Sequence, residues 1–504
     1  MSAPFTHRGG PVIRRLFLVV LLLPSVLCAQ AQTEYATRRL ELGAKIPDGA
    51  LVVLGGHEPA QDYLSFEQTP SFFYLTGFRE PDAALLMIKQ AGAVRSSTMF
   101  VNPRQPSREV WTGVRLGVPG VGTLTGIRGR SALELTKVLD SLAGTGMPFS
   151  VVGEVARAAD DQAAPVIRTP DDQIFDRLKR KFPSIKITTV NDAVEQLRGR
   201  KSAAELVLIR NAVDITSRGM KEVIPIIKPG LNEFELQALI EYTFRRNGAD
   251  RPSFSTIVGS GPNSTTLHYN VDDRFIGAND VVVMDIGASF KGYAADVTRT
   301  VPANGVFSLE QRAVYQLVRE AQKAAERQAR LGNVARLMSD SASAVLAAGL
   351  TRLGLIESPN ATYDCAAGPQ PRQCSQLQLF YMHGIGHGIG LEVHDPDQYY
   401  FTGRIQPGSA FTIEPGVYVR EHVLDEIPDT PRNREYAARA RNAVALYRNI
   451  GVRIEDDYIA TTQGVEWVSQ VPREINEIEE MMKKGSAGIA ARDEFRVEKY
   501  RLIP

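Results

Sequence analysis

The sequence predicts an α/β domain followed by a larger α+β domain, on three observations. At 504 residues the chain exceeds the roughly 250–300 residues at which a single hydrophobic core stops growing. Its first part contains short apolar runs separated by turns, whereas its second part combines long helical patterns with strands. A polar stretch, 198–201, lies between the two parts and marks the joint. The apolar fraction of 43% is that of an ordinary globular protein.

The first 31 residues resemble a secretory signal peptide. Arg14 and Arg15 precede the apolar run 16–23, and small residues lead to Ala31. We expect cleavage after Ala31 and export to the periplasm or the extracellular space. The run is shorter than the ~20 residues that span a membrane, so no stable membrane anchor is predicted. An uncleaved anchor is the alternative.

Charge and cysteine content restrict the partners and the compartment. Removal of residues 1–31 takes Arg8, Arg14 and Arg15 from the 58 basic residues and leaves 55 against 57 acidic ones. Such a balance does not favour binding to nucleic acid. Two cysteines remain, Cys365 and Cys374, and an even count suits an oxidising compartment. Because a short polar loop joins them, we predict a disulfide between them.

The first domain is expected over residues 32–200. Apolar runs at 50–54, 84–88 and 98–101 lie between Gly, Pro and polar clusters, a pattern typical of strands and turns. Helices are predicted at 171–181 and 190–199.

The second domain is expected over residues 201–475, and a C-terminal tail over 476–504. Ser202 and Glu205 have the spacing of a capping box, and so have Asn232 and Glu235, so each pair predicts the start of a helix. Further helices are predicted at 308–331, 334–354 and 474–484. The predicted strands are 280–288, 293–301, 409–414, 417–420 and 452–460.

Two of these strands each contain an aspartate in an apolar run. Asp285 lies in 281–287 and Asp296 in 293–300. A buried carboxylate is costly unless it is paired or binds a metal. A hairpin centred between Phe290 and Lys291 would place the two aspartates opposite each other, with Cβ atoms about 4.5–5.5 Å apart. A divalent cation between them would convert their repulsion into binding; the alternative is that both cap turns.

The segment 383–395 is rich in histidine and glycine. His383, His387 and His394 lie in it, among six histidines that remain after residue 31. Histidine is a common metal ligand, and glycines at alternate positions let the backbone approach a ligand closely. The spacing fits neither a dinucleotide fingerprint nor a P-loop. The alternative is a glycine-rich turn with histidines facing solvent.

Two further apolar strands each carry a glutamate, Glu414 in 411–416 and Glu455 in 451–457. Carboxylates with one imidazole form a hard divalent site that suits Mn²⁺ and tolerates Zn²⁺ or Co²⁺. Five ligands are too many for one tetrahedral zinc and suit two ions about 3.5–4 Å apart. We therefore predict a site for two divalent metal ions formed by Asp285, Asp296, His387, Glu414 and Glu455.

This ordered ligand set resembles that of the pita-bread metallopeptidases, the family of methionine aminopeptidase, prolidase and aminopeptidase P. The resemblance covers about residues 203–475, and 266–269, 383–395 and 451–457 are more similar to aminopeptidase P than to methionine aminopeptidase. Segments 73–82 and 111–113 resemble its creatinase-type N-terminal domain. The implied fold is an α/β creatinase-type domain followed by an α+β pita-bread catalytic domain.

The resemblance also implies which residue binds which ion. Asp285 would bind one ion, His387 and Glu414 would bind the other, and Asp296 and Glu455 would bridge them. Glu414 would also act as general base toward a bridging water, which two cations acidify to a hydroxide nucleophile.

Four further residues receive roles from the resemblance. His394 would stabilise the oxygen of the tetrahedral intermediate. His268, His383 and Arg453 would position the substrate and bond to the catalytic carboxylates. For each of the four the alternative is a structural polar residue near the site.

The implied activity is that of an exported Xaa-Pro aminopeptidase, which releases the first residue from peptides with proline in second position. The implied assembly is a homo-oligomer, a dimer or tetramer. Prolidase, which cleaves dipeptides, is the first alternative. The second is an inactive pita-bread binding module or a metal-free creatinase-type enzyme, both of which are expected to lack the metal ligands.

Two segments depart from the family pattern. Residues 419–449 separate Glu414 from Glu455 by more chain than the family usually has, and we expect them to form a mobile loop over the site. The stretch 365–374 also looks inserted.

Overall fold

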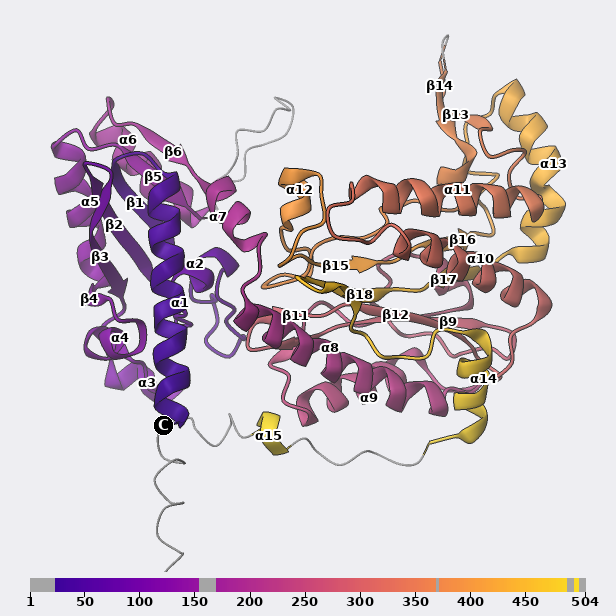
Figure 1. The fold of residues 1–504 in the computed structure, drawn as a ribbon, viewed down its shortest axis with the longest axis horizontal. Coiled ribbons are helices and arrows are strands. Elements are labelled where there is room, and N and C mark those ends of the chain that lie inside the picture. The colour runs from indigo at the N-terminus through magenta and orange to yellow at the C-terminus, as the bar shows by residue number, and fades with distance from the viewer. Residues whose placement is uncertain (1–22, 154–168, 369–370, 487–493, 498–504) are drawn as a thin grey trace, which may run out of the picture. The chain divides into compact units, whose positions relative to one another are not determined.

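The computed structural model describes residues 23–153, 169–368, 371–486 and 494–497, and the chain divides into two compact units, Met1–Leu197 and Arg198–Pro504 (Figure 1). Residues 1–22 of the expected signal peptide lie outside the described residues, and residues 23–31 belong to helix α1, Leu23–Lys45. None of the helices in these described ranges is long and apolar enough to cross a membrane.

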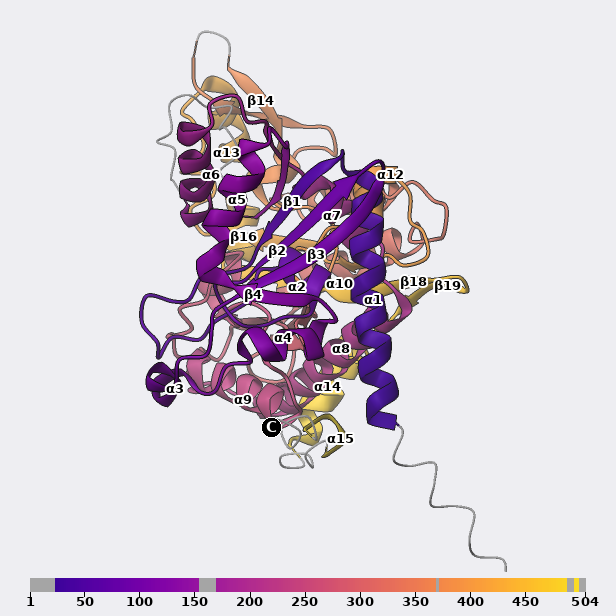
Figure 2. The same cartoon turned by 90° about the vertical axis from the view of Figure 1, so that its left-hand side faces the viewer.

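The first unit is built on a six-stranded sheet in the order β4-β3-β2-β1-β5-β6. Figure 2 shows β1, β2 and β3 side by side. The apolar runs predicted as strands form β1, β2 and β3, and their residues Val52, Leu86 and Phe100 are buried in one core. The strands are β1 (Gly49–Leu54), β2 (Ala84–Gln90), β3 (Ala93–Val101), β4 (Arg128–Ser131), β5 (Phe149–Val152) and β6 (Ile187–Thr189).

Helices surround this sheet. Helix α6 begins at a capping box, in which Thr169 and Asp172 each accept a hydrogen bond from the other's backbone N–H. The helices after α1 are α2 (Pro70–Thr76), α3 (Pro106–Thr112), α4 (Gly117–Thr125), α5 (Leu135–Gly144), α6 (Pro170–Lys181) and α7 (Asn191–Arg198), which ends at the boundary.

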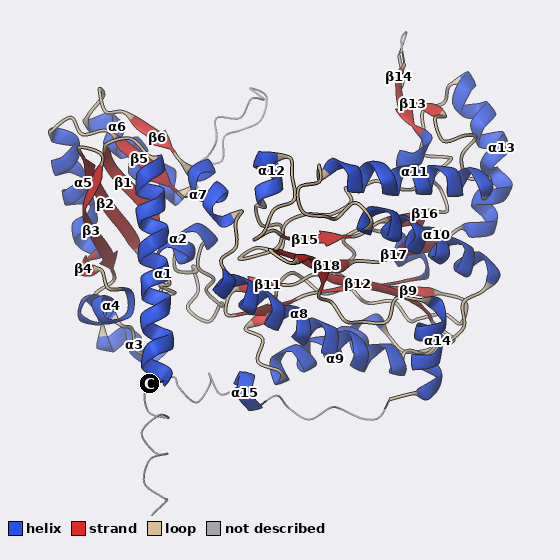
Figure 3. Cartoon of the chain, in the orientation of Figure 1, coloured by secondary structure: helices blue, strands red, loops and turns tan. Residues whose placement is uncertain are grey.

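The second unit has a layer of strands between two pairs of helices (Figure 3). Helix α8 packs against α9 and against strands β10 and β11, while α10 packs against α11 and against β15 to β17. Both predicted capping boxes are present, at Ser202 with Glu205 and at Asn232 with Glu235. The helices are α8 (Ala203–Val223), α9 (Glu233–Arg246), α10 (Leu309–Glu326), α11 (Arg336–Arg352), α12 (Gln398–Thr402), α13 (Pro431–Tyr447), α14 (Ile475–Lys484) and α15 (Glu494–Val497).

The strands of the second unit form small sheets in the orders β12-β9-β8, β11-β10-β7, β15-β18-β19, β16-β17 and β13-β14. Their bounds are β7 (Arg251–Pro252), β8 (Ile257–Ser260), β9 (Val281–Ile286), β10 (Ala288–Phe290), β11 (Tyr293–Ala294), β12 (Val297–Pro302), β13 (Thr362–Ala366), β14 (Arg372–Ser375), β15 (Ala410–Ile413), β16 (Gly416–Val419), β17 (Ile450–Arg453), β18 (Asp456–Thr461) and β19 (Gly464–Trp467).

The hairpin that carries the two aspartates turns one residue later than predicted. Phe290 pairs with Tyr293, so the turn residues are Lys291 and Gly292, both with positive φ, at 52° and 90°. Positive φ at both positions is the two-residue turn that matches strand twist. Asp285 therefore pairs with Thr298, and the prediction that it lies opposite Asp296 was wrong. The shift is two positions along the partner strand, so both aspartates still lie on one face.

The segment 419–449 contains a helix where a mobile loop was predicted. Helix α13 begins at Pro431, with Thr430 as its N-cap, and continues to Tyr447. Proline in the first turn and a threonine cap are ordinary helix starts. Tyr436 and Val444 on α13 are buried in the core of the second unit. The helix is inconspicuous in the sequence because it is rich in arginine and few large apolar residues mark its buried face.

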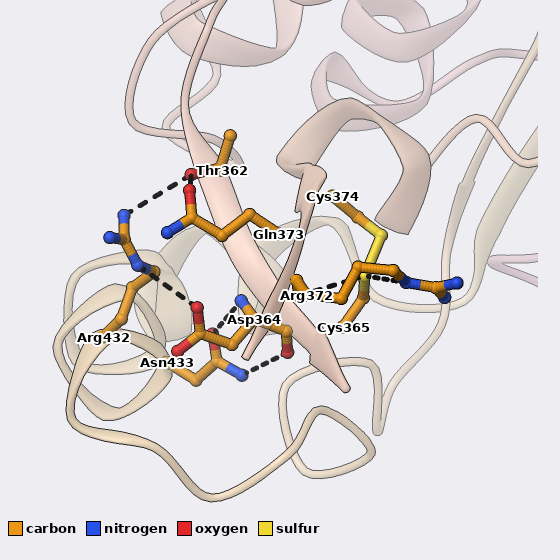
Figure 4. The surroundings of a disulfide bond; sticks show 8 residues. All are labelled: Thr362, Asp364, Cys365, Arg372, Gln373, Cys374, Arg432 and Asn433. Atoms are coloured by element: carbon orange, nitrogen blue, oxygen red, sulfur yellow. Dashed lines mark hydrogen bonds and ion pairs between the residues drawn. A yellow bond between two sulfur atoms is a disulfide. The ribbon is translucent and has the colours of Figure 1, made fainter. Parts of the chain in front are cut away.

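The start of α13 holds the hairpin β13-β14 that contains the two cysteines (Figure 4). Asp364 accepts a hydrogen bond from the Thr430 hydroxyl at 2.6 Å, and its backbone exchanges two bonds of 2.9 Å with the Asn433 side chain. Cys365 and Cys374 form a disulfide across the two strands. The two apparent insertions therefore form one structural unit.

Candidate metal centre

Neighbouring strands bring the five predicted ligands together. Thr298 and Glu455 exchange two backbone hydrogen bonds, which joins the strand of Asp296 to that of Glu455. The backbone N–H of Glu414 donates to Ile385, and that of Thr412 donates to His387. Asp285 pairs with Thr298, so together these contacts place the five predicted ligands on neighbouring stretches of chain. At Gly386, an added Cβ would lie 2.1 Å from the Thr412 carbonyl, so only glycine fits there.

His387 is the central residue of the cluster. Its Nε2 lies 3.4 Å from Glu414 Oε1, 3.5 Å from Asp296 Oδ2 and 3.8 Å from Glu455 Oε1. Asp296, His387 and Glu455 each offer one ligand atom, and these atoms all lie within 4.8 Å of one another. This arrangement can hold a divalent cation.

The buried carboxylates have unused binding capacity. Within the described residues, Asp285 Oδ1, Asp296 Oδ1 and Glu455 Oε1 are buried and accept no hydrogen bond. Buried polar atoms in native proteins are almost always satisfied. Four acidic side chains and an imidazole are also the donor set that hard divalent ions prefer. The residues present therefore fit divalent metal.

Electrostatics support the same conclusion. Burial raises the pKa of Asp296 and of Glu455 well above their ordinary values, and the neighbouring carboxylates raise both further. Burial also raises the pKa of Glu414, to about 8. Burial opposes ionisation of Asp285 as well, but Arg453, whose Nη2 lies 2.6 Å from its Oδ2, lowers the pKa of Asp285. A cation would remove the repulsion that raises these pKa values.

Two histidines of the site, His383 and His387, are neutral at neutral pH. Burial, with the charge of His394, lowers the pKa of His387 to about 4. Burial, with Arg453, lowers the pKa of His383 to about 4. A neutral imidazole is the form that binds metal, and its second nitrogen takes a protein partner. His387 Nδ1 lies 3.2 Å from the Gly388 carbonyl.

His383 and Arg453 share a partner that the sequence analysis missed. The Tyr418 hydroxyl lies 2.8 Å from His383 Nε2 and accepts a bond of 2.8 Å from Arg453 Nη1. Because Arg453 also binds Asp285, these residues form one buried network behind the ligands. Tyr418 follows Glu414 by four residues, and side chains two or four positions apart on a strand point to the same face. This spacing was the signal in the sequence that could have identified Tyr418.

His394 and His268 also lie at the site. The ring centroids of His394 and His387 are 4.1 Å apart. Burial lowers the pKa of His394, and the charge of His268 lowers it further. All nine predicted catalytic or metal residues belong to the second unit, whereas Cys365 and Cys374 lie on the β13-β14 hairpin.

Two other polar side chains near the ligands were not predicted. The Thr298 hydroxyl donates to Glu455 Oε2 at 2.7 Å and lies two residues after Asp296 on the same strand face. The Tyr381 hydroxyl is buried and has no hydrogen-bond partner within the described chain. Burial, and then the charge of Glu414, raises the pKa of Tyr381. No pattern in the sequence distinguishes Tyr381 from a core tyrosine.

Comparison with known proteins gives two family matches. Residues 207–462 match the model of metallopeptidase family M24, and residues 35–146 match that of the aminopeptidase P N-terminal domain. The chain is 32% identical to the Xaa-Pro aminopeptidase of Haemophilus influenzae over 461 residues, which covers 89% of this chain and 97% of that protein.

A dipeptidase and a solved structure are similar as well. The human Xaa-Pro dipeptidase is 30% identical over 474 residues, which covers 88% of this chain and 91% of that protein. A solved structure of Escherichia coli aminopeptidase P, a variant in complex with substrate, superposes with a TM-score of 0.73 at 28% identity. That match covers 90% of this chain and 98% of the other.

Proposed function

This chain belongs to metallopeptidase family M24 and is a metallo-aminopeptidase, and from that membership we propose that it hydrolyses the bond between the first residue of a peptide and a proline in second position. The observation that carries the proposal is the convergence of Asp285, Asp296, His387, Glu414 and Glu455 in a chain that aligns with Xaa-Pro aminopeptidases over most of its length. The fold supports it, since an aminopeptidase P-type N-terminal domain precedes a pita-bread domain.

We assign two divalent ions, Mn²⁺ in preference to Zn²⁺ or Co²⁺, to the five ligands. Asp285 would hold one ion, His387 and Glu414 the other, and Asp296 and Glu455 both. When bound, such a pair of ions polarises a carbonyl and lowers the pKa of a water molecule. The preference for Mn²⁺ follows from the excess of oxygen ligands over nitrogen.

Glu414 is placed to move the proton of the attacking water. Its Oε1 faces His387, whereas its Oε2 lies 3.6 Å from His383 Nδ1. One oxygen can thus bind metal while the other accepts a proton.

The remaining residues orient groups in the proposed reaction. His394 is neutral at neutral pH because burial, and then His268, lowers its pKa. A neutral imidazole has one N–H, which His394 would donate to the carbonyl oxygen as negative charge develops there. Arg453 and Tyr418 fix Asp285 and His383 through hydrogen bonds of 2.6–2.8 Å. Fixed donors cost no reorganisation during the reaction.

The alternative function is that of an Xaa-Pro dipeptidase, and the similarity to the human dipeptidase supports it. The two functions differ in the length of the peptide that is cleaved. A proline in second position makes a tertiary amide without an N–H, so a selective site must recognise ring shape. We expect the Mn²⁺-loaded protein to release the first residue from Xaa-Pro-Yaa and from a nonapeptide that begins Arg-Pro. Peptides with alanine in place of proline should not be cleaved.

Product analysis by mass spectrometry decides between the outcomes. Cleavage confined to Xaa-Pro would favour the dipeptidase, and cleavage of no Xaa-Pro peptide by a metal-loaded protein would reject both. Glu414→Gln is the matched control, because it keeps the side-chain volume but removes the base. If elemental analysis shows that it retains its metal, it should bind peptide without turnover.

We further propose that the enzyme is exported. The charged and apolar pattern of residues 1–31 supports this, and so does the disulfide between Cys365 and Cys374, since such bonds persist in oxidising compartments.

A further inference from the structure

Asp395, the residue after His394, is a buried carboxylate between two buried cations. Its side chain is 2% exposed, and those of Arg198 and Lys201 are 5% and 1% exposed. Arg198 Nη2 donates to Asp395 Oδ1, and Lys201 Nζ lies 3.1 Å from Oδ2. Arg198 is the first residue of the second unit, and Lys201 lies just before the N-cap of helix α8.

Such a cluster is an expensive way to stabilise a fold. Removing charges from water costs several kcal/mol per ion, and a buried pair at best recovers that cost. Burial opposes ionisation of Asp395, but Arg198 and then Lys201 outweigh it and lower the pKa of Asp395. The carboxylate therefore stays charged and holds both cations in fixed positions, which points to a geometric purpose.

The cluster fixes a short loop, Gly388–Pro396. Asp395 donates its backbone N–H to the Gly388 carbonyl at 2.8 Å and accepts the N–H of Glu392 at 3.2 Å through Oδ1. Lys201 Nζ donates to the Pro396 carbonyl at 2.5 Å. Both ends of the loop are thus tied to Asp395 or to its cationic partners.

His394 depends on this loop for its position. Within the described residues the His394 ring makes no hydrogen bond, although it lies 4.1 Å from the His387 ring between centroids. Its neighbours His383 and His387 each have a partner for a ring nitrogen. The placement of the His394 ring is therefore set by the backbone on which it is carried.

We propose that Arg198 and Lys201 are positioning residues for His394, which they hold in its working place through Asp395. The catalytic part of this inference rests on the function proposed for His394, whereas the placement of the ring does not. The side chains of Arg198 and Lys201 contact Glu392, Asp395 and Pro396, none of which is a predicted ligand, so metal binding should be independent of both cations.

Steady-state kinetics of the full chain give the first test. Arg198→Gln and Lys201→Met should each lower kcat for an Xaa-Pro-Yaa peptide by roughly ten- to a hundredfold, the effect of about 1 Å of misplacement. KM should change little, because His394 acts on charge that develops after binding. Metal content by elemental analysis should stay that of the wild type. Arg198→Lys, which keeps one charge, should recover part of kcat.

A matched control separates this effect from the loss of any ion pair. Arg210, on helix α8, forms a surface pair with Glu466 at 2.7 Å. Arg210→Gln removes the same type of side chain from the same unit and should leave kcat unchanged.

Nuclear magnetic resonance of histidine-labelled, metal-free protein tests the placement without activity. The signal of His394 is identified by its loss in His394→Gln. It should shift in Arg198→Gln, Arg198→Lys and Lys201→Met, and stay in place in Arg210→Gln. If the variants melt at lower temperature but keep kcat and the His394 signal, the cations are a structural anchor only and the proposal is wrong.

Failure of the proposed function and failure of the positioning proposal give different results. A wild-type protein that cleaves no Xaa-Pro peptide contradicts the proposed function, while the His394 signal still decides the positioning. If Arg198→Gln does not fold, Arg198→Lys is decisive by itself, because an unchanged kcat and an unchanged signal would overturn the proposal.

Discussion

At the scale of single residues, Asp296 and Glu455 are the most informative residues of the site. Asp296 and Glu455 each have one buried oxygen that accepts no hydrogen bond within the described chain. Burial raises the pKa of both, and the charges of nearby carboxylates, including Asp285, raise both pKa values further. A pair of acids in this state is poised for a shared cation rather than for a structural bond.

We predict that Asp296→Ala or Glu455→Ala removes both ions and nearly all activity, since each residue should bind both. The loss should exceed the ~100-fold that removal of an outer partner of a ligand costs. His57→Gln is the control, because His57 lies in the first unit, where its Nε2 is 2.8 Å from Asp171. Elemental analysis measures the ions, and two ions retained in active Asp296→Ala would refute the bridging assignment.

A second residue, Asp272, gives a prediction of pH dependence away from the ligands. It is fully buried, its Oδ1 accepts the Val258 N–H at 2.9 Å, and its Oδ2 has no partner within the described residues. Burial, with the charges of Glu233 and Glu241, raises the pKa of Asp272 to about 7. The folded state thus keeps this proton up to about pH 7, whereas the unfolded state loses it near pH 4.

Between those pH values the folded state binds more protons, so Asp272 lowers the free energy of unfolding as pH rises. Asp272→Asn mimics the neutral acid, and asparagine tolerates the φ of 52° at this position. We expect the variant to be more stable than wild type at pH 8, by up to roughly 4 kcal/mol, which is the free energy that a pKa raised from about 4 to about 7 represents, and equal to it near pH 4. Urea unfolding at both values measures this; an equal difference at both would contradict the assignment.

Sequence reasoning singled out the predicted ligands because a carboxylate inside an apolar strand is conspicuous. Asp285, Asp296 and Glu455 interrupt runs of buried residues, and burial of such groups needs a reason. Tyr418 and Tyr381 could not be found in that way, because a tyrosine in an apolar run is equally typical of an ordinary core. Their role depends on where the hydroxyl points, which only the tertiary structure determines.

At the scale of elements, helix starts were predictable and strand register was not. The capping boxes at Ser202 and Asn232 are local patterns, and both helices begin where these patterns indicate. The register of β9 and β12 depends on which residues of 290–292 form the turn. A two-residue turn with positive φ at both positions prefers Asn, Asp or Gly there. Lys291 is not one of these residues, so the sequence does not mark 291–292 clearly as the turn.

The β13-β14 hairpin is the element that the disulfide closes. The loop between Cys365 and Cys374 is short, so we predict that replacement of both by serine lowers the free energy of unfolding by at most ~3 kcal/mol. The effect should be small because Asp364 still binds Thr430 and Asn433 on the α13 side. Urea unfolding gives the energy, and thiol titration of the unfolded, unreduced mature chain should find no free thiol. Two free thiols would refute the bond.

At the scale of the whole molecule, the division at Arg198 separates two units that differ in what they contribute. All nine predicted catalytic or metal residues lie in the second unit, and no comparable group of metal-binding side chains occurs among the described residues of the first. Domain order was predictable from composition and pattern. The helix within residues 419–449 was not predictable, because the family pattern that guided the assignment of the flanking segments does not include this insertion.

Export makes a prediction about the whole chain. Cleavage after Ala31 would leave Gln32 as the first residue, within helix α1. The Gln32 side chain donates to the carbonyls of Thr123 and Leu124, at 2.7 and 2.9 Å, so the new terminus would be held in place. N-terminal sequencing of protein from the periplasm or culture medium should begin at Gln32. Recovery of the full-length chain in the cytoplasm alone would contradict the prediction.

The unsatisfied carboxyl oxygens have a consequence for the abundance of the protein. A ligand that binds only the folded state stabilises it by mass action, and the unfolded chain does not hold these oxygens close together. Folding and metal loading are therefore coupled, and scarcity of divalent metal should increase the fraction of chains open to proteolysis. A cell that limits metal would regulate how many copies of this protein survive, in addition to how many are active.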